Sequence, residues 1–333
     1  MGDLKFSVCI ATYDMGSLIG RTLDDILAQS YQNYEIIVSD NASTDDTQKV
    51  VEGYQDSRIR YFKNNTNIGY AANLNACVGH ATGDIIFLMS AKSRISPDAL
   101  EQTYRAFSLS GDVGAVTRPY YWYGIDLNEV VRAKDRFALD GDILLSVHDD
   151  PGKIIELFKT VDNPGGLAYR KMYLDTPFHQ DPFVEFIYPF ASILKKHSVV
   201  LLGTYTMACP ALEYSGSQNP FVYKKSPIQC WVDMFETVFK GPELKTLKER
   251  CIRDFVAVNY VGLAQVRNYG GFKCLLREIL QLIKYRKANL FSLKFWVYSI
   301  GSIVIPPCLL KRMVKFCKKD INSKLLKNIK LGA

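Results

Sequence analysis

Short polar segments follow four predicted strands in the first hundred residues. They are Ala11-Thr12-Tyr13, Asp40-Asn41-Ala42, residues 64–67 and Ser90-Ala91-Lys92. Parallel strands end at one edge of their sheet, and ligands of such sheets bind outside that edge. A carboxylate, carboxamides, hydroxyls and one ammonium group would therefore meet there. These groups suit hydrogen bonds to a base and ribose, and charge pairing with a phosphate.

Two common nucleotide motifs and the common cysteine motifs are absent from the sequence. No Gly-x-Gly-x-x-Gly follows the first predicted strand, and no Gly-x-x-x-x-Gly-Lys-Ser/Thr occurs. The chain therefore lacks a dinucleotide fingerprint and a P-loop. None of the eight cysteines has Cys-x-x-Cys spacing, which excludes a zinc ribbon and a thioredoxin-type motif. We expect free thiols in a reducing compartment.

Two hydrophobic periodicities alternate over the first 117 residues, and they predict the elements that position the polar segments. Continuous apolar runs predict strands, and three- to four-residue spacing predicts helices. The predicted strands are 6–11, 34–39, 58–62, 84–89 and 113–117, and the predicted helices are 17–29, 43–54, 69–80 and 97–109. This order predicts an α/β fold with a mostly parallel, doubly wound sheet flanked by helices.

The pattern is less regular after residue 120. An aromatic run at 120–123 forms either part of the core or a stacking surface, and 124–150 shows no clear period. Helices are predicted at 151–160, 182–196 (kinked at Pro189), 243–268 and 272–287, and strands at 166–169 and 199–202. A helical C-terminal extension therefore follows the sheet.

Net charge divides the 333-residue chain into two unequal parts. The formal charge is +7, but residues 271–333 carry +12 and the first 270 residues carry −5. Apolar residues at 310, 314, 317, 321, 325 and 329 alternate with lysines, which predicts a basic amphipathic helix. The uncharged stretch 295–310 precedes it, is too short to span a bilayer and is interrupted by Pro306-Pro307.

Together these features favour a peripheral anchor on an anionic membrane surface. A helix that packs on the body with solvated lysines is the alternative. Nucleic acid is a weaker alternative, because no reader motif accompanies the charge. The N-terminus leads directly into a strand without a signal-peptide pattern, so we expect a cytoplasmic protein that is peripheral on the inner face of the cell membrane.

The first hundred residues resemble family 2 glycosyltransferases of the GT-A fold. The resemblance rests on FSVCIATYD, ILAQSYQNYEIIVSDNASTDDT, SRIRYFKNNTNIGYAANLN, ATGDIIFLM and SPDAL, which occur in this order. It implies transfer of a sugar from a nucleotide-activated donor, with inversion, in surface polysaccharide assembly. It places base and ribose near Ala11, Thr12 and Tyr13. The exposed Asp40 carboxylate either accepts an N–H of the base or forms a turn or helix cap, and Asn67 and Asn73 either read the base or form a turn and helix cap.

The chain departs from this family after the fourth predicted strand. The family places Asp-x-Asp there to hold Mg²⁺ or Mn²⁺, whereas this chain has Ser90-Ala91-Lys92-Ser93. Hard divalent ions prefer oxygen ligands and a lysine would repel them, so we expect no metal at this position. Three explanations for the missing carboxylates stay open. Lys92 neutralises the leaving phosphate, the donor carries a single phosphate, or catalysis has been lost. If a metal is bound elsewhere, its ligands would come from Asp140-Gly141-Asp142 or His148-Asp149-Asp150.

An inverting transfer also requires a general base near the acceptor hydroxyl. The resemblance places it in FHQDPFVEFIYPFASILKKHSVVLL, where Glu185 is favoured over Asp181, and His179 is a possible helper. Asp181 would share a helix face with Glu185 if the turn were regular.

The predicted organisation is a catalytic domain at 1–210, a helical extension at 211–270 and a basic membrane-associating region at 271–333. Within the catalytic domain, residues 1–117 form the donor-nucleotide half and 118–210 the acceptor half. The acceptor is expected to be a glycan or lipid-linked oligosaccharide. The alternative is a catalytically silent protein of this fold that binds glycan or a partner enzyme.

Overall fold

The computed structural model describes residues 3–134, 141–211, 219–310, 312 and 329–332. Its main sheet has eight strands in the order β3-β2-β1-β4-β10-β6-β11-β9. The strands are β1 (Phe6–Thr12), β2 (Tyr34–Asp40), β3 (Ile59–Lys63), β4 (Ile85–Met89), β6 (Val113–Thr117), β9 (Ile143–Leu145), β10 (Ala168–Arg170) and β11 (Ser198–Leu201). β10 pairs antiparallel with β4 and β6, and β9 pairs antiparallel with β11, while the other pairs are parallel. The predicted mostly parallel sheet is confirmed.

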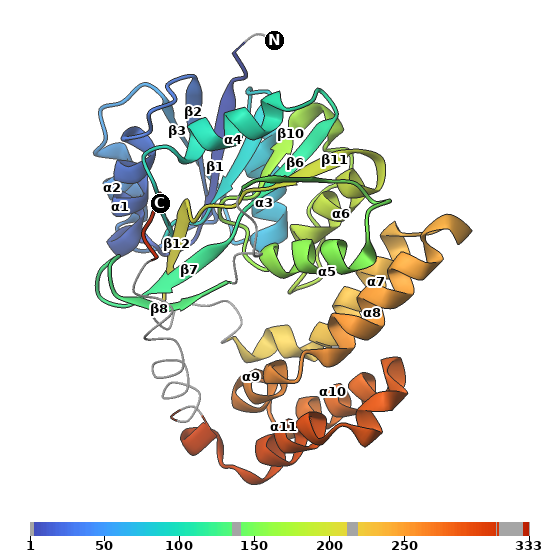
Figure 1. The fold of residues 1–333 in the computed structure, drawn as a ribbon. Helices are drawn as coiled ribbons and strands as arrows, with labels where there is room; N and C mark the ends of the chain where they lie inside the picture. Colours follow the sequence, from blue (N-terminus) through green and yellow to red (C-terminus); the bar gives the residue numbers. More distant parts are fainter. Residues whose placement is uncertain (1–2, 135–140, 212–218, 311, 313–328, 333) are drawn as a thin grey trace.

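Helices cover both faces of this sheet (Figure 1). They are α1 (Gly16–Leu27), α2 (Thr47–Glu52), α3 (Tyr70–Gly79), α4 (Ala99–Ser108), α5 (Pro151–Thr160) and α6 (Ile187–Lys196). Alternate residues of β1 point into different core clusters: Cys9 packs with residues of α3, α5 and α6, whereas Val8 and Ile10 pack with residues of α1 and α4. The side-chain period of a strand thus explains the two helical layers.

A second, smaller sheet was not predicted. Its order is β5-β12-β7-β8, formed by β5 (Arg94–Ile95), β12 (Met207–Pro210), β7 (Tyr120–Tyr123) and β8 (Val130–Ala133). The aromatic run at 120–123 is therefore a strand, and the region 124–150 contributes β8 and β9 to two different sheets. Such short strands carry too few residues to show a hydrophobic period.

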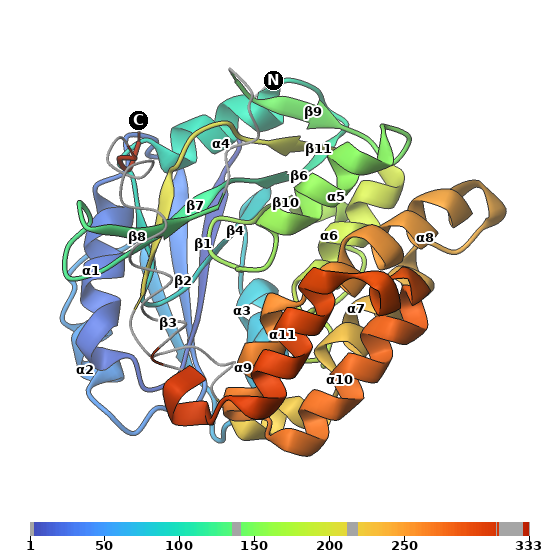
Figure 2. The same cartoon turned by 60° about the horizontal axis from the view of Figure 1, so that its bottom comes forward.

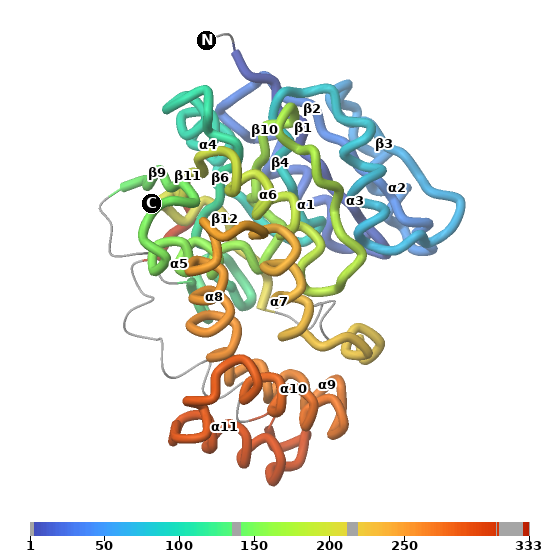
Figure 3. The backbone as a smooth tube through the Cα atoms, turned by 90° about the vertical axis from the view of Figure 1, so that its right-hand side faces the viewer, coloured from blue at the N-terminus to red at the C-terminus, as the bar shows by residue number. Residues whose placement is uncertain are grey.

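The helical extension contains α7 (Pro227–Val238), α8 (Lys245–Asp254), α9 (Val261–Tyr269), α10 (Phe272–Tyr285) and α11 (Leu293–Val304). The prediction of one helix over 243–268 is wrong, because the chain turns between α8 and α9. There the Tyr260 ring lies 5.7 Å from Phe295, and its hydroxyl donates to Asn289 at 2.6 Å. Figure 3 shows α7 and α8 between the sheet region and α9 to α11.

The C-terminal residues return to the small sheet. Ile329 and Leu331 pack against Tyr121, Tyr123 and Tyr205, and the Gly332 N–H donates to the Tyr205 carbonyl at 2.8 Å. Ile329 is not helical, so the predicted helix does not include it. The rest of that prediction, at 311 and 313–328, lies outside the described residues. Among those described, no helix is long and apolar enough to cross a membrane.

Candidate active site

The strand register brings the predicted polar segments to one edge of the main sheet. Thr12 pairs with Asp40, Asp40 pairs with Lys63, and Ile10 pairs with Met89, the last residue of β4. Residues that follow β1, β2 and β4 therefore lie next to one another. Figure 2 turns this end toward the viewer and shows the small sheet and the helical extension on its two sides.

Several hydrogen bonds join the residues after β1 to the residues after β2. The N–H groups of residues 14, 15 and 16 donate to side chains of the second loop, and the Thr44 N–H donates back to Asp14. The loops approach so closely that a Cβ on Gly16 would lie 2.8 Å from the Thr47 nitrogen. Tyr13 projects outward at 43% exposure, while Ala11 is half-buried. The Thr12 hydroxyl is buried without a hydrogen-bond partner in the described part of the chain.

The Asp40 side chain is buried, so its predicted exposure is wrong. Its carboxylate accepts the Ser43 N–H at 2.8 Å and the Tyr61 hydroxyl. Both donors come from the immediate surroundings, the turn after β2 and the neighbouring strand β3, and they draw the carboxylate inward. Contact between Asp40 and a base stays a prediction, and in this arrangement Asp40 shapes the turn that precedes α2.

A network of carboxamides occupies the same edge. The Asn41 oxygen accepts from Asn64 at 3.2 Å and from the Ile68 N–H at 2.9 Å, and the Asn41 nitrogen donates to Asn67 at 2.8 Å. Asn73 is buried and bonds to Ser39 through both its oxygen and its nitrogen. Asn67 is exposed, and its oxygen also accepts the Gly69 N–H at 3.0 Å. The NH₂ group of Asn67 thus faces outward from a turn, whereas Asn73 positions β2.

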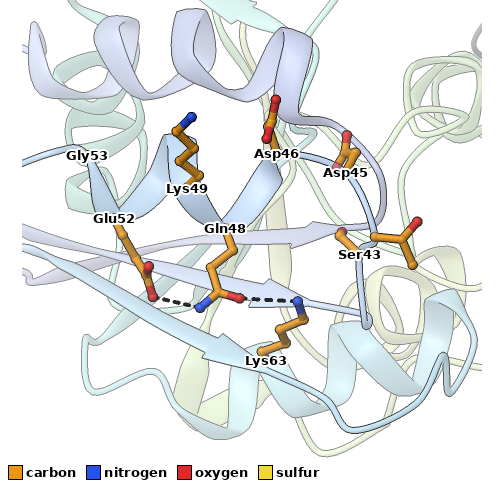
Figure 4. A pocket seen from close by; sticks show the side chains of 9 residues that line it. Ser43, Asp45, Asp46, Gln48, Lys49, Glu52, Gly53 and Lys63 are labelled. Carbon is orange, nitrogen blue, oxygen red and sulfur yellow. Dashed lines mark hydrogen bonds between the residues drawn. The ribbon is translucent and has the colours of Figure 1, made fainter.

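A shallow polar depression of about 570 Å³ lies beside α2 (Figure 4). It is lined by side chains of both charges, among them Asp45, Lys49, Glu52 and Lys63, with Gln48 hydrogen-bonded to Glu52 and Lys63. None of its lining residues is Thr12, Lys92 or Glu185. It lies away from the ends of β1 and β4, so we place the candidate active site at the strand ends and not here.

Ser90, Ala91 and Lys92 form the turn after β4. The Ser93 N–H donates to the Ser90 carbonyl at 3.1 Å, Ala91 is buried and Lys92 is half-buried. Burial lowers the pKa of the Lys92 ammonium, an effect that Cys209 opposes. No hydrogen bond or ion pair of Lys92 joins it to any other described residue. An unpaired, partly desolvated ammonium group at a ligand-binding edge suits an anionic ligand.

The residues at this turn do not fit a divalent cation. They offer a hydroxyl, a methyl group and an ammonium group, and no carboxylate. Across residues 3–134, 141–211, 219–310, 312 and 329–332, no group of three or more His, Cys, Asp or Glu side chains could hold a metal. Of the alternative acids, Asp142 accepts the Gly203 N–H, Asp149 accepts from Ser146, and Asp150 caps α5 through the Gly152 N–H, whereas Asp140 lies outside the described residues.

Glu185 lies in a loop just before α6, so the predicted helix over 182–196 begins too early. α6 starts at Ile187, and Pro189 falls in its first turn, where proline causes no kink. Glu185 and Asp181 therefore do not share a helix face. Phe183 has φ +79, a conformation rare for a residue with a side chain. The surroundings overcome this strain and fix the loop, as is common at functional sites.

The Glu185 carboxylate occupies a poorly solvated position near the strand-end edge. Burial raises the pKa of its carboxyl to about 7, although backbone N–H groups oppose the shift. The loop that carries Glu185 contacts α3, because the Asn75 carboxamide donates to the Phe178 carbonyl at 3.0 Å and the His179 N–H donates to the Glu185 carbonyl at 2.9 Å. The charge of Glu185 also raises the pKa of the Tyr70 hydroxyl, after local burial, although 41% of the Tyr70 side chain is exposed. Tyr70 begins α3 directly after the Asn67 turn. Glu185 thus lies on the same side of the sheet as the predicted donor residues.

Asp181 and His179 have other partners in the same loop. Asp181 is buried and forms an ion pair with Lys225. The His179 ring stacks on Tyr188 at 4.0 Å, and its Nδ1 accepts the Asp181 N–H at 3.2 Å. Burial and then Lys225 lower the pKa of His179, which keeps the ring neutral. Since the Asp181 carboxylate is neutralised by a lysine, it is a weaker base than Glu185.

Sequence reasoning missed three residues at this edge. Asp14 bonds to the Thr44 N–H at 2.8 Å, Asn41 centres the carboxamide network, and the pKa of Tyr70 responds to the charge of Glu185. Asn41 belongs to a polar segment that was named from the sequence, but the binding role was predicted for Asp40, because the burial of Asp40 could not be foreseen. Nothing in the local pattern marks Asp14 or Tyr70, because their roles depend on loops brought together from distant parts of the chain.

Comparison with known proteins identifies the family. A family model described as Glycosyl transferase family 2 matches residues 7–174, half of the chain. The chain is 27% identical over 183 residues to an uncharacterized glycosyltransferase of Nostoc sp., covering 54% of this chain and 55% of that protein. It is 38% identical over 85 residues to the Escherichia coli UDP-Glc:alpha-D-GlcNAc-diphosphoundecaprenol beta-1,3-glucosyltransferase WfaP, covering 26% of this chain and 34% of WfaP. These matches thus span about a third to a half of the relatives' length.

Solved structures match more of the chain. Residues 1–349 of S. aureus TarS in complex with UDP-GlcNAc match with a TM-score of 0.64 and 14% identity, covering 94% of this chain and 91% of that one. The mannosyltransferase PcManGT from Pyrobaculum calidifontis in complex with GDP-Man and Mn²⁺ matches with a TM-score of 0.52 and 19% identity, covering 91% and 87%. The predicted GT-A architecture is confirmed. With the family match over residues 7–174, the chain belongs to glycosyl transferase family 2.

Proposed function

We propose that this protein is an inverting glycosyltransferase that moves a sugar from a nucleotide-activated donor to a lipid-linked glycan, without a metal at the end of β4. Two observations carry the proposal. Burial raises the pKa of the Glu185 carboxyl, just before α6, to about 7, and the half-buried Lys92 ammonium group after β4 is unpaired within the described part of the chain. An acid–base group and an anion-binding group are what an inverting transfer from a phosphate requires.

The donor nucleotide would occupy the edge formed by the loops after β1 and β2. Thr12 offers an unsatisfied hydroxyl, Tyr13 an exposed ring, and Asn67 an outward-facing NH₂ group. The hydrogen bonds between the two loops hold these groups in place before the donor arrives, which lowers the cost of ordering them. Similar folds bind such donors: the structures of TarS and PcManGT contain UDP-GlcNAc and GDP-Man.

Residues of this chain can account for the proton and the charge that the transfer step moves. Glu185 accepts the proton of the acceptor hydroxyl as the acceptor oxygen forms a bond to the anomeric carbon. The bond from that carbon to the phosphate oxygen breaks, and its electron pair leaves with the phosphate. Lys92 stabilises the negative charge that develops on that oxygen. Attack from the face opposite the leaving group inverts the anomeric centre.

Support for a lipid-linked acceptor comes from the relatives and from the surface of α10 and α11. WfaP is named for a diphosphoundecaprenol acceptor, as is a Campylobacter jejuni glucosyltransferase that is 34% identical over 99 residues, covering 29% of this chain and 32% of that protein. Large apolar side chains recur at three- and four-residue spacing along α10 and along α11, so on each helix they share a face. They are Leu276, Leu280, Leu293, Val297, Ile300 and Val304, all exposed.

This apolar surface is bordered by exposed lysines. Lys273 and Lys284 lie on α10, and Lys287 and Lys294 lie before and within α11. Apolar side chains flanked by cations suit the boundary between acyl chains and anionic headgroups. We therefore propose that the surface of α10 and α11 contacts the inner face of the cell membrane, where it would bring the strand-end site to a lipid-bound acceptor.

Donor turnover measured with and without EDTA tests the proposed function. The purified chain is incubated with a panel of UDP-, GDP-, CMP- and dTDP-sugars and a lipid-diphosphate sugar acceptor, and released nucleotide is quantified. Turnover that persists in EDTA supports the proposal, whereas activity that depends on added Mn²⁺ contradicts metal independence. Thermal stabilisation by a nucleotide sugar without turnover would favour the catalytically silent alternative.

A further inference from the structure

One face of the small sheet carries a row of three side chains from neighbouring strands. Cys209 of β12 pairs with Trp122 of β7, and Trp122 pairs with Arg132 of β8. Directly paired residues project from the same face of a sheet. The Arg132 guanidinium stacks on the Trp122 ring, with its central carbon 4.5 Å from the ring centre.

This face is directed toward the end of β4. Trp122 packs against the core cluster that also contains Cys209, and β12 pairs with β5, which directly follows the turn that carries Lys92. At the β12 end of the row, the Cys209 sulfur lies 3.5 Å from the Ser93 hydroxyl, immediately after Lys92. The row therefore runs from Lys92 through Cys209 and Trp122 to Arg132.

Among the described residues, no acidic side chain forms an ion pair with Lys92 or Arg132, the cations at the ends of the row. The nearby Lys134 differs, because its Nζ lies 2.6 Å from Asp162, which also accepts the Tyr120 hydroxyl at 2.7 Å. Both unpaired cations are half-buried. Half-buried cations without counter-charges favour the binding of an anion.

We propose that Lys92, Trp122 and Arg132 form a single subsite for a sugar diphosphate. Lys92 and Arg132 would contact the phosphates, and the solvent-accessible part of the half-buried Trp122 indole would contact the sugar ring. An arginine that is already stacked presents its N–H groups in a fixed plane suited to phosphate oxygens. The assignment rests on the proposed function, in which such a group enters either as the donor or as the lipid-linked acceptor.

Inorganic pyrophosphate tests the subsite independently of turnover. Binding is followed by tryptophan fluorescence in the wild type and in Arg132→Gln, Lys92→Gln and Lys134→Gln. Each lost charge-assisted contact should weaken pyrophosphate binding about tenfold in the first two variants, while Lys134→Gln, which removes a paired lysine, should change it little. The signal should vanish in Trp122→Phe. Equal affinity in Arg132→Gln and the wild type, with unchanged thermal stability, would overturn the proposal.

Steady-state kinetics then distinguish the two sources of the diphosphate. A rise in the KM for the nucleotide sugar in Arg132→Gln assigns the subsite to the donor, and a rise in the KM for the lipid-diphosphate sugar assigns it to the acceptor. Arg132→Lys should restore part of the loss, because it keeps the charge but not the stacked plane. If pyrophosphate binds as expected but no donor is turned over, the proposed function fails and the anion subsite stands.

Discussion

The Asp14 carboxylate accepts a hydrogen bond from the Thr44 backbone N–H at 2.8 Å, and this contact joins the ends of two neighbouring strands. Asp14 has φ +49, a conformation that aspartate and asparagine tolerate better than most residues. One residue thus combines a special backbone geometry with a bond between loops 30 positions apart in the chain. This contact thus fixes the segment that carries Thr12 and Tyr13, which are proposed to contact the donor.

Asp14→Ala should therefore weaken donor binding more than it weakens the fold. The variant leaves the Thr44 N–H without its partner and places alanine in an unfavourable conformation, which together should destabilise the protein by about 1–3 kcal/mol. Asp14→Asn keeps an oxygen acceptor and the tolerance of positive φ, so it is the matched control. Nucleotide-sugar affinity and urea unfolding, measured for both variants, check this. Equal affinity in the two variants would contradict a role for the loop junction.

Glu185→Gln should lower transfer by a factor of about 10²–10⁴, the usual contribution of a general base. In the wild type, burial raises the carboxyl pKa to about 7, so kcat/KM should fall as the pH drops below 7 and the base becomes protonated. The glutamine variant should lose this limb of the pH profile. Asp181→Asn is the control, since it removes the neighbouring carboxylate that pairs with Lys225. A larger loss in Asp181→Asn would identify Asp181 as the base.

Much of the fold could be predicted from the sequence, but the site could be predicted only in part. The runs at 34–39 and 84–89 were recognisable because strands buried on both faces are continuously apolar. The small sheet was not, because β5, β7, β8 and β12 are two to four residues long and come from three distant regions. Burial of Asp40 was equally hidden, since it depends on a hydroxyl from the neighbouring strand.

The same Glu185 substitution should change how stability depends on pH. The pKa is about 7 in the folded protein against a reference value of 4.5, so between these pH values the unfolded chain has lost the proton and the folded chain retains it. Folding stability attributable to this group is therefore lost as the pH rises through this window, by up to about 3 kcal/mol above pH 7.

Urea unfolding of the wild type and Glu185→Gln at pH 4 and pH 8 measures this effect. The variant should gain stability relative to the wild type at pH 8 compared with pH 4. Glu249→Gln, on the exposed side of α8, is the control and should show no comparable change. A difference that is the same at both pH values would mean that the carboxyl is not desolvated.

Lys92→Ala should lower kcat by about 10²–10³ if the ammonium group stabilises the leaving phosphate, a loss comparable to removal of one donor to a developing oxyanion. Lys92→Arg should retain a substantial part of the activity, because it preserves the charge. Lys49→Ala removes an exposed lysine from the depression beside α2 and serves as the matched control. Rescue of Lys92→Ala by Mn²⁺ to wild-type rates would indicate that a cation of either kind suffices at this position.

Charge placed on the outer surface of α10 and α11 should release the protein from membranes. Leu280 and Val297 are 68% and 61% exposed, so Leu280→Glu with Val297→Glu should leave the core intact. On the membrane, two apolar side chains that insert among the lipids would be replaced by two charges that repel an anionic surface. This should weaken binding to anionic vesicles at least about tenfold. Leu109→Glu, 61% exposed at the end of α4, is the control.

Vesicle co-sedimentation at several salt concentrations measures the binding. Unchanged binding of the double variant would exclude this surface. Binding that disappears in high salt even for the wild type would assign the attraction mainly to the lysines. If the proposed anchor is correct, the double variant should also lose activity on a lipid-linked acceptor held in vesicles, yet keep it on a water-soluble analogue. That contrast would separate membrane delivery of the acceptor from the chemistry at Glu185 and Lys92.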